Sequence, residues 1–429
     1  QLQMFIRDSY GMFFILNTKK VQCMWMKNTY IPLSVAYMDG SGKIINIYDM
    51  VPLSKISVCS DRPALYALEV NRGWFKRNNI KVFGPNKISS QLEGSKIFTK
   101  NLCKKYNIPT ADFGTFKTKE KTIKFLKKAK HPIVIKADNL ASGKGVYICK
   151  NLDESTNAVE EIFGGKFGYA ENILVEEFLE GEEMSYFIIS DGKDFRSFGT
   201  AQDHKRVGEG DTGKNTGGMG AYSPSRLINN ELNQKILNKI IKPTLKGLSD
   251  LGTDYKGFLY AGLMVKNNEP YLIEYNVRMG DPECQTLLPI LNTDFLDILI
   301  ACIEQNLENI KIEWANKKSL CVVLCSKGYP DKYEKKIKIN NLNALKLDNN
   351  NHLFHAGTVI EDNEILAVGG RVLNFISLSK DLSSARENIH NNLNKLNWGE
   401  GFYRKDLSLI HISEPTRRRG ISYAVFCLK

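Results

Sequence analysis

The sequence predicts an α+β protein of several domains, with a small β-rich unit, a larger central α+β unit and a small α/β unit. Three observations support this fold class. A chain of 429 residues has room for about two to four domains. Short apolar runs separated by turn residues fill residues 1–82, whereas strand and helix patterns alternate from residue 83 onward. The hydrophobic content of 42% is ample for ordinary cores.

Composition disfavours several classes of function. The formal net charge of +12 comes from lysines scattered along the chain, with no basic run interleaved with aromatic residues, so we expect no nucleic-acid partner. The nine cysteines contain no C-x-x-C pair and stand among apolar residues, which favours reduced core cysteines in a cytoplasmic protein over disulfides or a zinc site. No apolar run of about 18 residues occurs, so we expect no membrane partner. The start at Gln1 suggests a fragment and leaves a signal peptide open.

The first 82 residues predict a compact β-rich domain. Turn residues separate its short apolar runs, and a short helical pattern follows Asn71. The expected strands are Gly11–Leu16, Val21–Trp25, Ser34–Met38, Lys43–Tyr48 and Ala64–Val70. The words GMFF, MWMKNTYIPLSVAYMD, GKIINI, MVPLS and SDRPALYALEVNRGWF, in this order, resemble the DUF192 family of small β-rich domains. That family implies no settled chemistry, so we assign Trp25, Lys27 and Glu69 structural roles.

At residues 78–82 this pattern gives way to a different one that opens with Phe83-Gly84-Pro85. No Pro-, Gly- or Ser-rich linker separates the two patterns, although a natural fusion usually has an exposed flexible linker at its boundary. We therefore interpret the junction as a recombined or misassembled sequence.

The central unit begins with helical patterns and a lysine-bearing flap. Apolar spacing predicts a helix over Leu92–Tyr106 and a second helix that is capped by Thr118 and ends at His131-Pro132. The apolar strand Ile133–Lys136 leads into a glycine-containing loop over residues 137–146. Backbone N–H groups of such a loop can close over phosphates, with Lys136 and Lys144 as counter-charges. An ordinary hairpin with surface lysines explains the local pattern equally well, and no Walker motif is present.

Two further stretches have the character of a binding site. A strand over Ile173–Glu176, a short connection and a strand over Met184–Ile189 form a hinge beside paired glutamates, which suits adenine and ribose hydroxyls. The word QDHKR at residues 202–206 precedes a glycine-rich stretch at residues 211–222. So many glycines make a poor helix or strand, and we expect a loop whose backbone approaches an anionic ligand.

The stretch LIEYNVRMGDPE at residues 272–283 is the strongest candidate site. Strand alternation places Glu274, Asn276 and Arg278 on one face, with Ile273, Tyr275 and Val277 on the core face. Carboxylate and carboxamide oxygens suit Mg²⁺, and an arginine suits phosphate, so the pattern fits phosphoryl transfer. Taken alone, an edge strand with a solvated polar face is the simpler interpretation. A strand over Phe258–Val265 and a turn at residues 267–270 deliver this strand as a hairpin, and an amphipathic helix over Asn292–Ile303 follows.

Residues 316–406 predict the small α/β unit. It begins with a strand over Ser319–Cys325, continues through residues 355–358 and 366–373, and ends with a helix over Asp381–Leu396. Cys321 and Cys325 share one strand face, which favours core packing over a metal site. His355 and Arg371 could reach a substrate phosphate, but we assign neither to the site.

Residues 407–429 break the preceding pattern. The words LSLIHISEPTR and ISYAVFCL resemble the conceptual translation of a sequencing adaptor. The alternative is a basic tail in which Arg417–Arg419 bind an anionic partner. We interpret this stretch as a non-native tail and leave it out of the fold prediction.

Six words of the central unit resemble one enzyme family. QLEGSK, PIVIKADNLASGKGV, VEEFLEGEE, QDHKRVGEGDTGKNTGGMGAYSP, GFLYAGLM and IEYNVRMGDPECQ, in this order, are similar to the phosphoribosylamine–glycine ligase family, which belongs to the ATP-grasp superfamily. The resemblance implies an ATP-grasp fold, in which two α+β subdomains grip ATP, over residues 83–315. The word GGRVL at residues 369–373 resembles the C-terminal domain of the same family, over residues 316–406.

The resemblance also implies roles for individual residues. Glu274 and Asn276 match the Mg²⁺ or Mn²⁺ ligands, Arg278 stabilises the transferred phosphoryl group, and Lys136 joins it in catalysis. The ATP-binding set is Lys96, Lys136, Gly143, Lys144 and Gly145 on the phosphates, Glu176, Glu177 and Leu179 at adenine, and Glu183 at ribose. The positions that hold the substrates are Asp203, His204, Lys205, Arg206, Asn215, Gly217 and Gly218.

The implied reaction uses ATP to join glycine to phosphoribosylamine in purine biosynthesis, and we expect a monomer. The family's N-terminal nucleotide-type domain should precede Phe83, where the DUF192-like domain stands instead. We therefore expect residues 83–315 to bind Mg·ATP and expect little ligase turnover from this exact chain. The alternatives are another ATP-grasp ligase that joins a different carboxylate and amine, or a non-enzymatic β module fused to an ATP-binding remnant.

Overall fold

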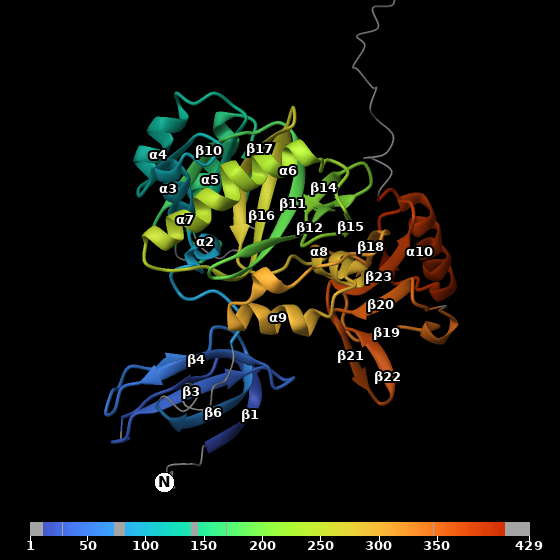
Figure 1. Ribbon diagram of the computed structural model, residues 1–429, viewed down its shortest axis with the longest axis horizontal. Coiled ribbons are helices and arrows are strands. Elements are labelled where there is room, and N and C mark those ends of the chain that lie inside the picture. The colour runs from blue at the N-terminus through green and yellow to red at the C-terminus, as the bar shows by residue number, and fades with distance from the viewer. Residues whose placement is uncertain are drawn as a thin grey trace, which may run out of the picture. The chain divides into compact units, whose positions relative to one another are not determined.

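A computed structural model describes residues 12–27, 29–72, 82–138, 145–168, 170–345 and 347–407. The chain divides into two compact units, Gln1–Val82 and Phe83–Lys429 (Figure 1). The helical pattern expected after Asn71, most of the junction at residues 78–82 and nearly all of the tail lie outside the described residues. In the part of the chain that is described, no helix has the length and apolar character needed to cross a bilayer.

The first unit is built on a four-stranded antiparallel sheet with strand order β1-β6-β3-β4. Its strands are β1 (Met12–Lys20), β3 (Leu33–Met38), β4 (Ile44–Met50) and β6 (Ala64–Asn71). All six residues of β3, which lies between β6 and β4 in the sheet, are buried. Val35, Tyr37 and Met50 are at most 1% exposed and form the centre of the core. The β-rich character predicted for this region is confirmed.

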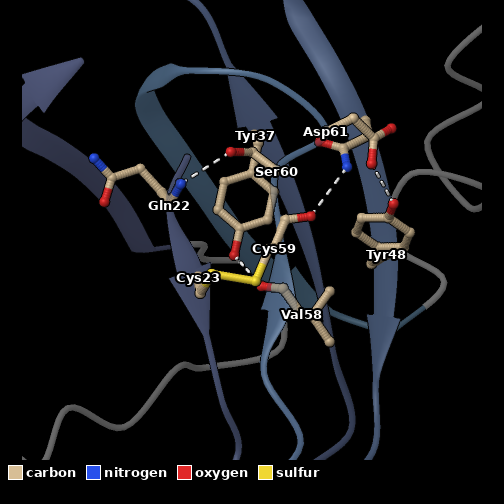
Figure 2. Close-up of a disulfide and its surroundings, with 9 residues drawn as sticks. Gln22, Cys23, Tyr37, Tyr48, Val58, Cys59, Ser60 and Asp61 are labelled. Carbon is tan, nitrogen blue, oxygen red and sulfur yellow. Dashed lines mark hydrogen bonds between the residues drawn. A yellow bond between two sulfur atoms is a disulfide. The ribbon is translucent and has the colours of Figure 1, made fainter. Parts of the chain in front are cut away.

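A disulfide joins the two short strands β2 (Cys23–Met24) and β5 (Val58–Cys59), as Figure 2 shows. The prediction of nine reduced cysteines was therefore wrong for this pair. Cys23 and Cys59 are 36 residues apart in the sequence, and only the strand pairing brings them directly opposite each other with a Cα–Cα distance of 4.0 Å. The six other cysteines in the described part are free, as predicted, and five of them are buried.

Hydrogen bonds fix the strands around this disulfide. The Tyr37 hydroxyl donates to the Val58 carbonyl at 2.6 Å, and the Gln22 amide donates to Ser60 Oγ at 3.0 Å (Figure 2). On the neighbouring strand, the Tyr48 hydroxyl donates to Asp61 at 2.6 Å. The two tyrosine contacts hold the β2–β5 pair against β3 and β4. The disulfide therefore crosslinks two segments that hydrogen bonds already fix in place.

We expect Cys59→Ser, or treatment with a thiol reductant, to destabilise the first unit by about 3–4 kcal/mol, because the disulfide closes a loop of 36 residues. Amide hydrogen exchange in β3 and β6 measures this change. The free cysteines of the second unit supply the control, since reductant should leave exchange in that unit unaltered. Equal exchange in β3 with and without the disulfide would contradict the expectation.

The second unit contains a four-stranded antiparallel sheet with strand order β7-β10-β8-β9. Its strands are β7 (Phe113–Phe116), β8 (Ile133–Ala137), β9 (Val146–Cys149) and β10 (Ile173–Glu177). Helices α4 (Lys119–Leu126) and α5 (Leu152–Phe163) pack on this sheet. Thr118 and Asn151 cap these helices, because their side chains accept hydrogen bonds from Lys121 N and Glu154 N. The predicted cap at Thr118 is confirmed.

The larger sheet of the second unit has nine antiparallel strands (Figure 1). Its main path runs β17-β16-β11-β12-β15-β18-β23-β20, and β24 pairs with β18. The strands are β11 (Glu182–Asp191), β12 (Phe195–Asp203), β15 (Gly220–Ser223), β16 (Lys256–Lys266), β17 (Glu269–Asn276), β18 (Lys318–Ser326), β20 (Asn351–His355), β23 (Arg371–Ser379) and β24 (Gly401–Phe402). Because β15 pairs with β18, the sheet continues across the boundary expected at residues 315 and 316.

Both faces of this sheet are covered. Tyr186 and Ile188 of β11 face a core with α2 (Gln91–Gly94), α3 (Lys96–Tyr106), α6 (Asn230–Ile236) and α7 (Lys242–Asp250). Phe187 and Ile189 face the opposite core with α8 (Glu283–Leu287) and α9 (Phe295–Glu304). Helix α10 (Leu382–Leu396) packs on β18 and β23, next to a small sheet of β19 (Ile337–Lys338), β21 (Thr358–Glu361) and β22 (Glu364–Ala367). The α+β fold class is therefore confirmed.

Two local predictions were wrong. The helix expected over Leu92–Tyr106 is divided at Ser95, whose extended backbone ends α2 and whose side chain caps α3. The glycine-rich stretch at residues 211–222 contains two short strands, β14 (Thr212–Asn215) and β15, and β14 pairs with β13 (Arg206–Gly208). Glycine is needed within β15, because a Cβ on Gly220, at φ +157°, would lie 2.4 Å from the Cys321 carbonyl oxygen of the neighbouring strand.

Candidate active site

The β16–β17 hairpin positions the predicted metal ligands. Asn267 and Asn268 both have positive φ angles, 52° and 62°, which suits the two-residue turn that joins the strands. Glu274 lies opposite Gly262 and Asn276 lies opposite Tyr260, so the carboxylate and the carboxamide follow each other at the end of β17. Arg278 lies just beyond the last residue of the strand.

A β-bulge changes the faces predicted for β17. Leu272 pairs with Leu263 and Glu274 pairs with Gly262, so Ile273 is the extra residue on its strand. Leu272 and Tyr275 lie in the core, whereas Ile273 lines the same cavity as Glu274. The core position predicted for Ile273 was therefore wrong, while those of Tyr275 and Val277 are confirmed.

Charged side chains from β11, β12, β17 and the loop after β12 surround a small cavity beside Glu274. The structure brings four of the predicted site residues to it: Glu183, Asp203, Lys205 and Glu274. The remaining lining residues are Met184, Ser185, Tyr260, Gly262, Leu263 and Ile273. Lys205 Nζ lies 2.7 Å from Glu183 Oε2 and lowers the pKa of that carboxyl group. Burial, together with the charge of Glu283, raises the pKa of Asp203 well above its usual value.

Two buried lysines, one on the smaller sheet and one on α3, form a cluster with Glu176. Lys136 Nζ on β8 lies 2.9 Å from Glu176 Oε2 on β10, and Lys100 Nζ on α3 lies 3.3 Å from Oε1. All three side chains are at most 5% exposed. Lys96, one helical turn before Lys100, has a pKa lowered by burial, and the carboxylate of Glu274 opposes that shift. Lys96 therefore lies within electrostatic reach of the predicted metal ligand.

Two features of this cluster depart from the sequence prediction. Glu176 was placed at the adenine, but its carboxylate is held by Lys136 and Lys100. Lys100 was not predicted as a site residue, although its position four residues after Lys96 in a helix places both lysines on one face. Glu177 Oε1 accepts a hydrogen bond from the Asp112 amide at 3.2 Å, and Leu179 lies in the connection between β10 and β11.

The ends of the predicted flap are tied down. Asp138 Oδ1 accepts hydrogen bonds from Ile97 N at 3.1 Å and from Ser95 Oγ at 3.2 Å, which joins the flap to the start of α3. At the other end, Ala137 N donates to the Gly145 carbonyl at 2.9 Å. Gly143 and Lys144 lie outside the described residues.

The remaining predicted substrate residues are less closely grouped. His204 is only 2% exposed and its ring lies 6.0 Å from that of Tyr222, so the structure places it in the interior. Arg206 and Asn215 pair with each other on the β13–β14 hairpin, and neither lines the cavity. The backbone of Gly217 binds Arg371 and Tyr329, and a Cβ on Gly218 would lie 3.0 Å from Asp203 Oδ1. Gly218 therefore approaches the cavity, and Gly217 contacts the C-terminal part of the sheet.

Glu93 is a second residue that the sequence prediction missed. Its carboxylate accepts hydrogen bonds from Val277 N at 2.9 Å and from Arg278 Nε at 3.0 Å. The sequence did contain a signal for Glu93, because this residue belongs to the family word QLEGSK. Its contact with Arg278 could not be predicted, because the two residues are 185 positions apart in the sequence.

The donor set fits Mg²⁺. Glu274 and Asn276 offer one carboxylate and one carboxamide oxygen from the same end of β17. Among the described residues there is no cluster of three or more His, Cys, Asp or Glu side chains suited to a metal. Mg²⁺ is commonly held by one or two protein oxygens together with nucleotide phosphates, so a sparse oxygen site agrees with this ion better than with zinc.

The fold and this site define an ATP-grasp ligase, in which two antiparallel sheets bring lysines and hard oxygen ligands together. Family models describe the same regions: the phosphoribosylglycinamide synthetase ATP-grasp (A) domain matches residues 94–284 and its C domain matches residues 319–409. The uncharacterised DUF192 family matches residues 3–83. The chain belongs to the phosphoribosylamine–glycine ligase family of purine biosynthesis.

Individual relatives support this assignment. Phosphoribosylamine–glycine ligase of Brucella melitensis is 44% identical over 333 residues, which cover 77% of this chain and 78% of that protein. The chloroplastic enzyme of Arabidopsis thaliana is 45% identical over 334 residues, covering 76% of this chain and 63% of that protein. The crystal structure of the Thermotoga maritima ligase has a TM-score of 0.71 at 34% identity and covers 78% of this chain and 83% of its own.

Proposed function

We propose that the second unit binds Mg·ATP where the smaller sheet meets the β16–β17 end of the larger sheet. The observation that carries this proposal is the buried cluster in which Glu176 lies 2.9 Å from Lys136 and 3.3 Å from Lys100, in the same unit as Glu274 and Asn276 at the end of β17. Lysines neutralise the charge of a triphosphate, and a nearby carboxylate and carboxamide hold its metal ion. A purely structural cluster would have no need to bury two lysines around one glutamate, because removing ions from water is costly.

The proposed contacts follow the two sheets. Lys96, Lys136, Lys144 and the backbone of Gly143 and Gly145 contact the phosphates, Glu177 and Leu179 contact adenine, and Glu183 contacts ribose. Glu176 holds Lys136 and Lys100 in place. Asp203 and Lys205 in the cavity contact the acceptor substrates, and Arg206, Asn215, Gly217 and Gly218 form the more distant part of that site. Because His204 is buried, we assign it to supporting Asp203 and Lys205.

The reaction that this site supports is the joining of glycine to phosphoribosylamine. A carboxylate is a poor electrophile, because oxide would have to leave. Transfer of the terminal phosphoryl group of ATP to the glycine carboxylate releases ADP and gives an acyl phosphate. The amine of phosphoribosylamine then attacks the acyl carbon, and phosphate leaves as glycinamide ribonucleotide forms. Lys136 and Arg278 hold the transferred group in line, and a bound Mg²⁺ or Mn²⁺ supplies further neutralisation of phosphate charge.

We expect Mg·ATP to bind the full chain, and Glu274→Gln to weaken that binding at least about tenfold, because a charged ligand to the metal becomes neutral. Isothermal titration calorimetry measures both affinities. Glu269→Gln is a matched control, since Glu269 lies at the other end of β17 and its carboxylate forms ion pairs with Lys235 and Lys239. No ATP binding by the unchanged chain, or equal binding by Glu274→Gln, would contradict the proposal.

The rate of ligation by this chain does not follow from its affinity for nucleotide. A DUF192-type unit precedes the ligase region of this chain, and we propose that ligation is slow although nucleotide binding is retained. Rapid formation of glycinamide ribonucleotide from glycine, phosphoribosylamine and Mg·ATP would contradict this part. A panel of other carboxylates and amines tests the alternative of a different ATP-grasp ligase.

We also propose domain bounds, a compartment and an oligomeric state for the chain. We place the ATP-grasp domain at residues 83–315 and the C-terminal domain at residues 316–406. The six free cysteines described in the second unit fit a reducing compartment such as the cytoplasm, in which the Cys23–Cys59 disulfide of the first unit would be exposed to reduction. We expect a monomer, which sedimentation analysis can test.

A further inference from the structure

Glu93 joins helix α2 to the end of the proposed metal-binding strand. One carboxylate oxygen, Oε2, accepts the Val277 amide at 2.9 Å. The other, Oε1, accepts Arg278 Nε at 3.0 Å and lies 3.0 Å from the second guanidinium nitrogen of the same residue. The Glu93 side chain is 20% exposed and the Arg278 side chain is 58% exposed, so the pair is shielded from water on the glutamate side alone.

Arg278 links Glu93 to Asn276. The guanidinium nitrogen that lies near Glu93 also donates to Asn276 Oδ1 at 3.3 Å. The third nitrogen donates to the Met279 carbonyl at 3.0 Å. A guanidinium group is planar and its donors have fixed directions, so these acceptors together fix its plane. The bond to Asn276 selects which amide atom faces the arginine and leaves one lone pair of Oδ1 for a metal ion.

A purely structural role for Glu93 would require only the bond to Val277. That bond keeps the end of β17 against α2, and a neutral glutamine side chain could also accept it. The contacts to Arg278 need the charge and the second oxygen, because charge-assisted hydrogen bonds are stronger than neutral ones. Glu93→Gln therefore separates the two roles.

We propose that Glu93 is a positioning residue for phosphoryl transfer. Through Arg278 it orients the carboxamide oxygen of Asn276 toward the metal ion and holds the guanidinium beside the position of the transferred phosphoryl group, which ADP lacks. This inference rests on the proposed Mg·ATP site. It adds to that site a residue of helix α2. Glu93 acts on the metal ligand Asn276 without contacting the metal itself.

The test measures the coupling between metal and nucleotide in the full chain. Calorimetry gives the affinity for ADP in the presence of Mg²⁺ and in the presence of a chelator. The coupling is the affinity with Mg²⁺ divided by the affinity with chelator. Glu93→Gln should lower this ratio about tenfold, as expected for loss of a hydrogen bond to a charged group, and should leave the affinity without metal unaltered. Glu269→Gln should change neither value. Hydrogen exchange in β16 checks that the variants remain folded.

A second variant tests the route through Arg278. In the Arg278→Ala background, Glu93→Gln should have no further effect on the ratio, because its action requires the guanidinium. An unchanged ratio in Glu93→Gln, or additive effects in the double variant, would overturn the inference while the Mg·ATP site stands. Failure of the unchanged chain to bind ADP at all would overturn the proposed function and this inference with it.

Discussion

Glu176→Ala should destabilise the second unit by about 3–5 kcal/mol, because it leaves the buried lysines Lys136 and Lys100 without their carboxylate. All three groups are nearly inaccessible to water, so hydration cannot replace the lost partner. Amide hydrogen exchange in β10 and β11 measures the change in unfolding free energy. Glu176→Ala should also weaken Mg·ATP binding, since Lys136 loses the contact that directs it toward the phosphates.

A matched control is available on the same subdomain. Glu160 on α5 lies 2.6 Å from Lys119, but both side chains are at least 44% exposed. Glu160→Ala should cost less than about 1 kcal/mol, because exposed ion pairs contribute little. A loss of stability in Glu176→Ala no larger than that in Glu160→Ala would show that the buried cluster does not depend on its glutamate.

Replacing the arginine at the position of Arg278 by alanine in an intact member of the family should lower turnover about a hundredfold. This corresponds to about 3 kcal/mol, the loss expected for one preorganised donor to the charge that develops during phosphoryl transfer. Steady-state kinetics with glycine, phosphoribosylamine and ATP measures the effect. The structure supports the assignment, because Glu93, Asn276 and Met279 together fix the guanidinium beside the proposed metal ligands.

The control for this substitution, in a family member that carries an arginine at the position of Arg196, is that arginine. It donates to the backbone carbonyls of Phe195 and Glu308 and does not line the cavity beside Glu274. Its replacement by alanine should leave turnover within about twofold of the unaltered enzyme. If the Arg278 position proved equally insensitive, the arginine would have no part in the chemistry.

Local patterns predicted most of the secondary structure. The cap at Thr118, the turn at Asn267 and Asn268 and the helix that follows Asp381 depend on neighbours in the sequence, and the structure contains all three. The break at Ser95 and the bulge at Ile273 depend on packing between distant segments. Alternation along a strand could not reveal a bulge, because the extra residue is defined only by its partner strand.

In the candidate site too, contacts between neighbours in the sequence could be predicted and contacts between distant segments could not. Glu274 and Asn276 lie two residues apart on one strand, so their grouping could be predicted from the sequence. The contacts of Glu176 with Lys100 and of Glu93 with Arg278 join different elements, and no local pattern contains them. The Cys23–Cys59 disulfide was missed for this reason too, since β2 and β5 meet only in the folded unit.

The most direct test of the proposed metal site is a crystal structure of the full chain with Mn²⁺ and ADP, with anomalous scattering used to locate the metal. We predict an anomalous peak within about 2–2.5 Å of a Glu274 carboxylate oxygen and of Asn276 Oδ1, with the ADP phosphates on its other side. A peak bound elsewhere, or nucleotide bound with its phosphates away from Lys96 and Lys136, would contradict the account.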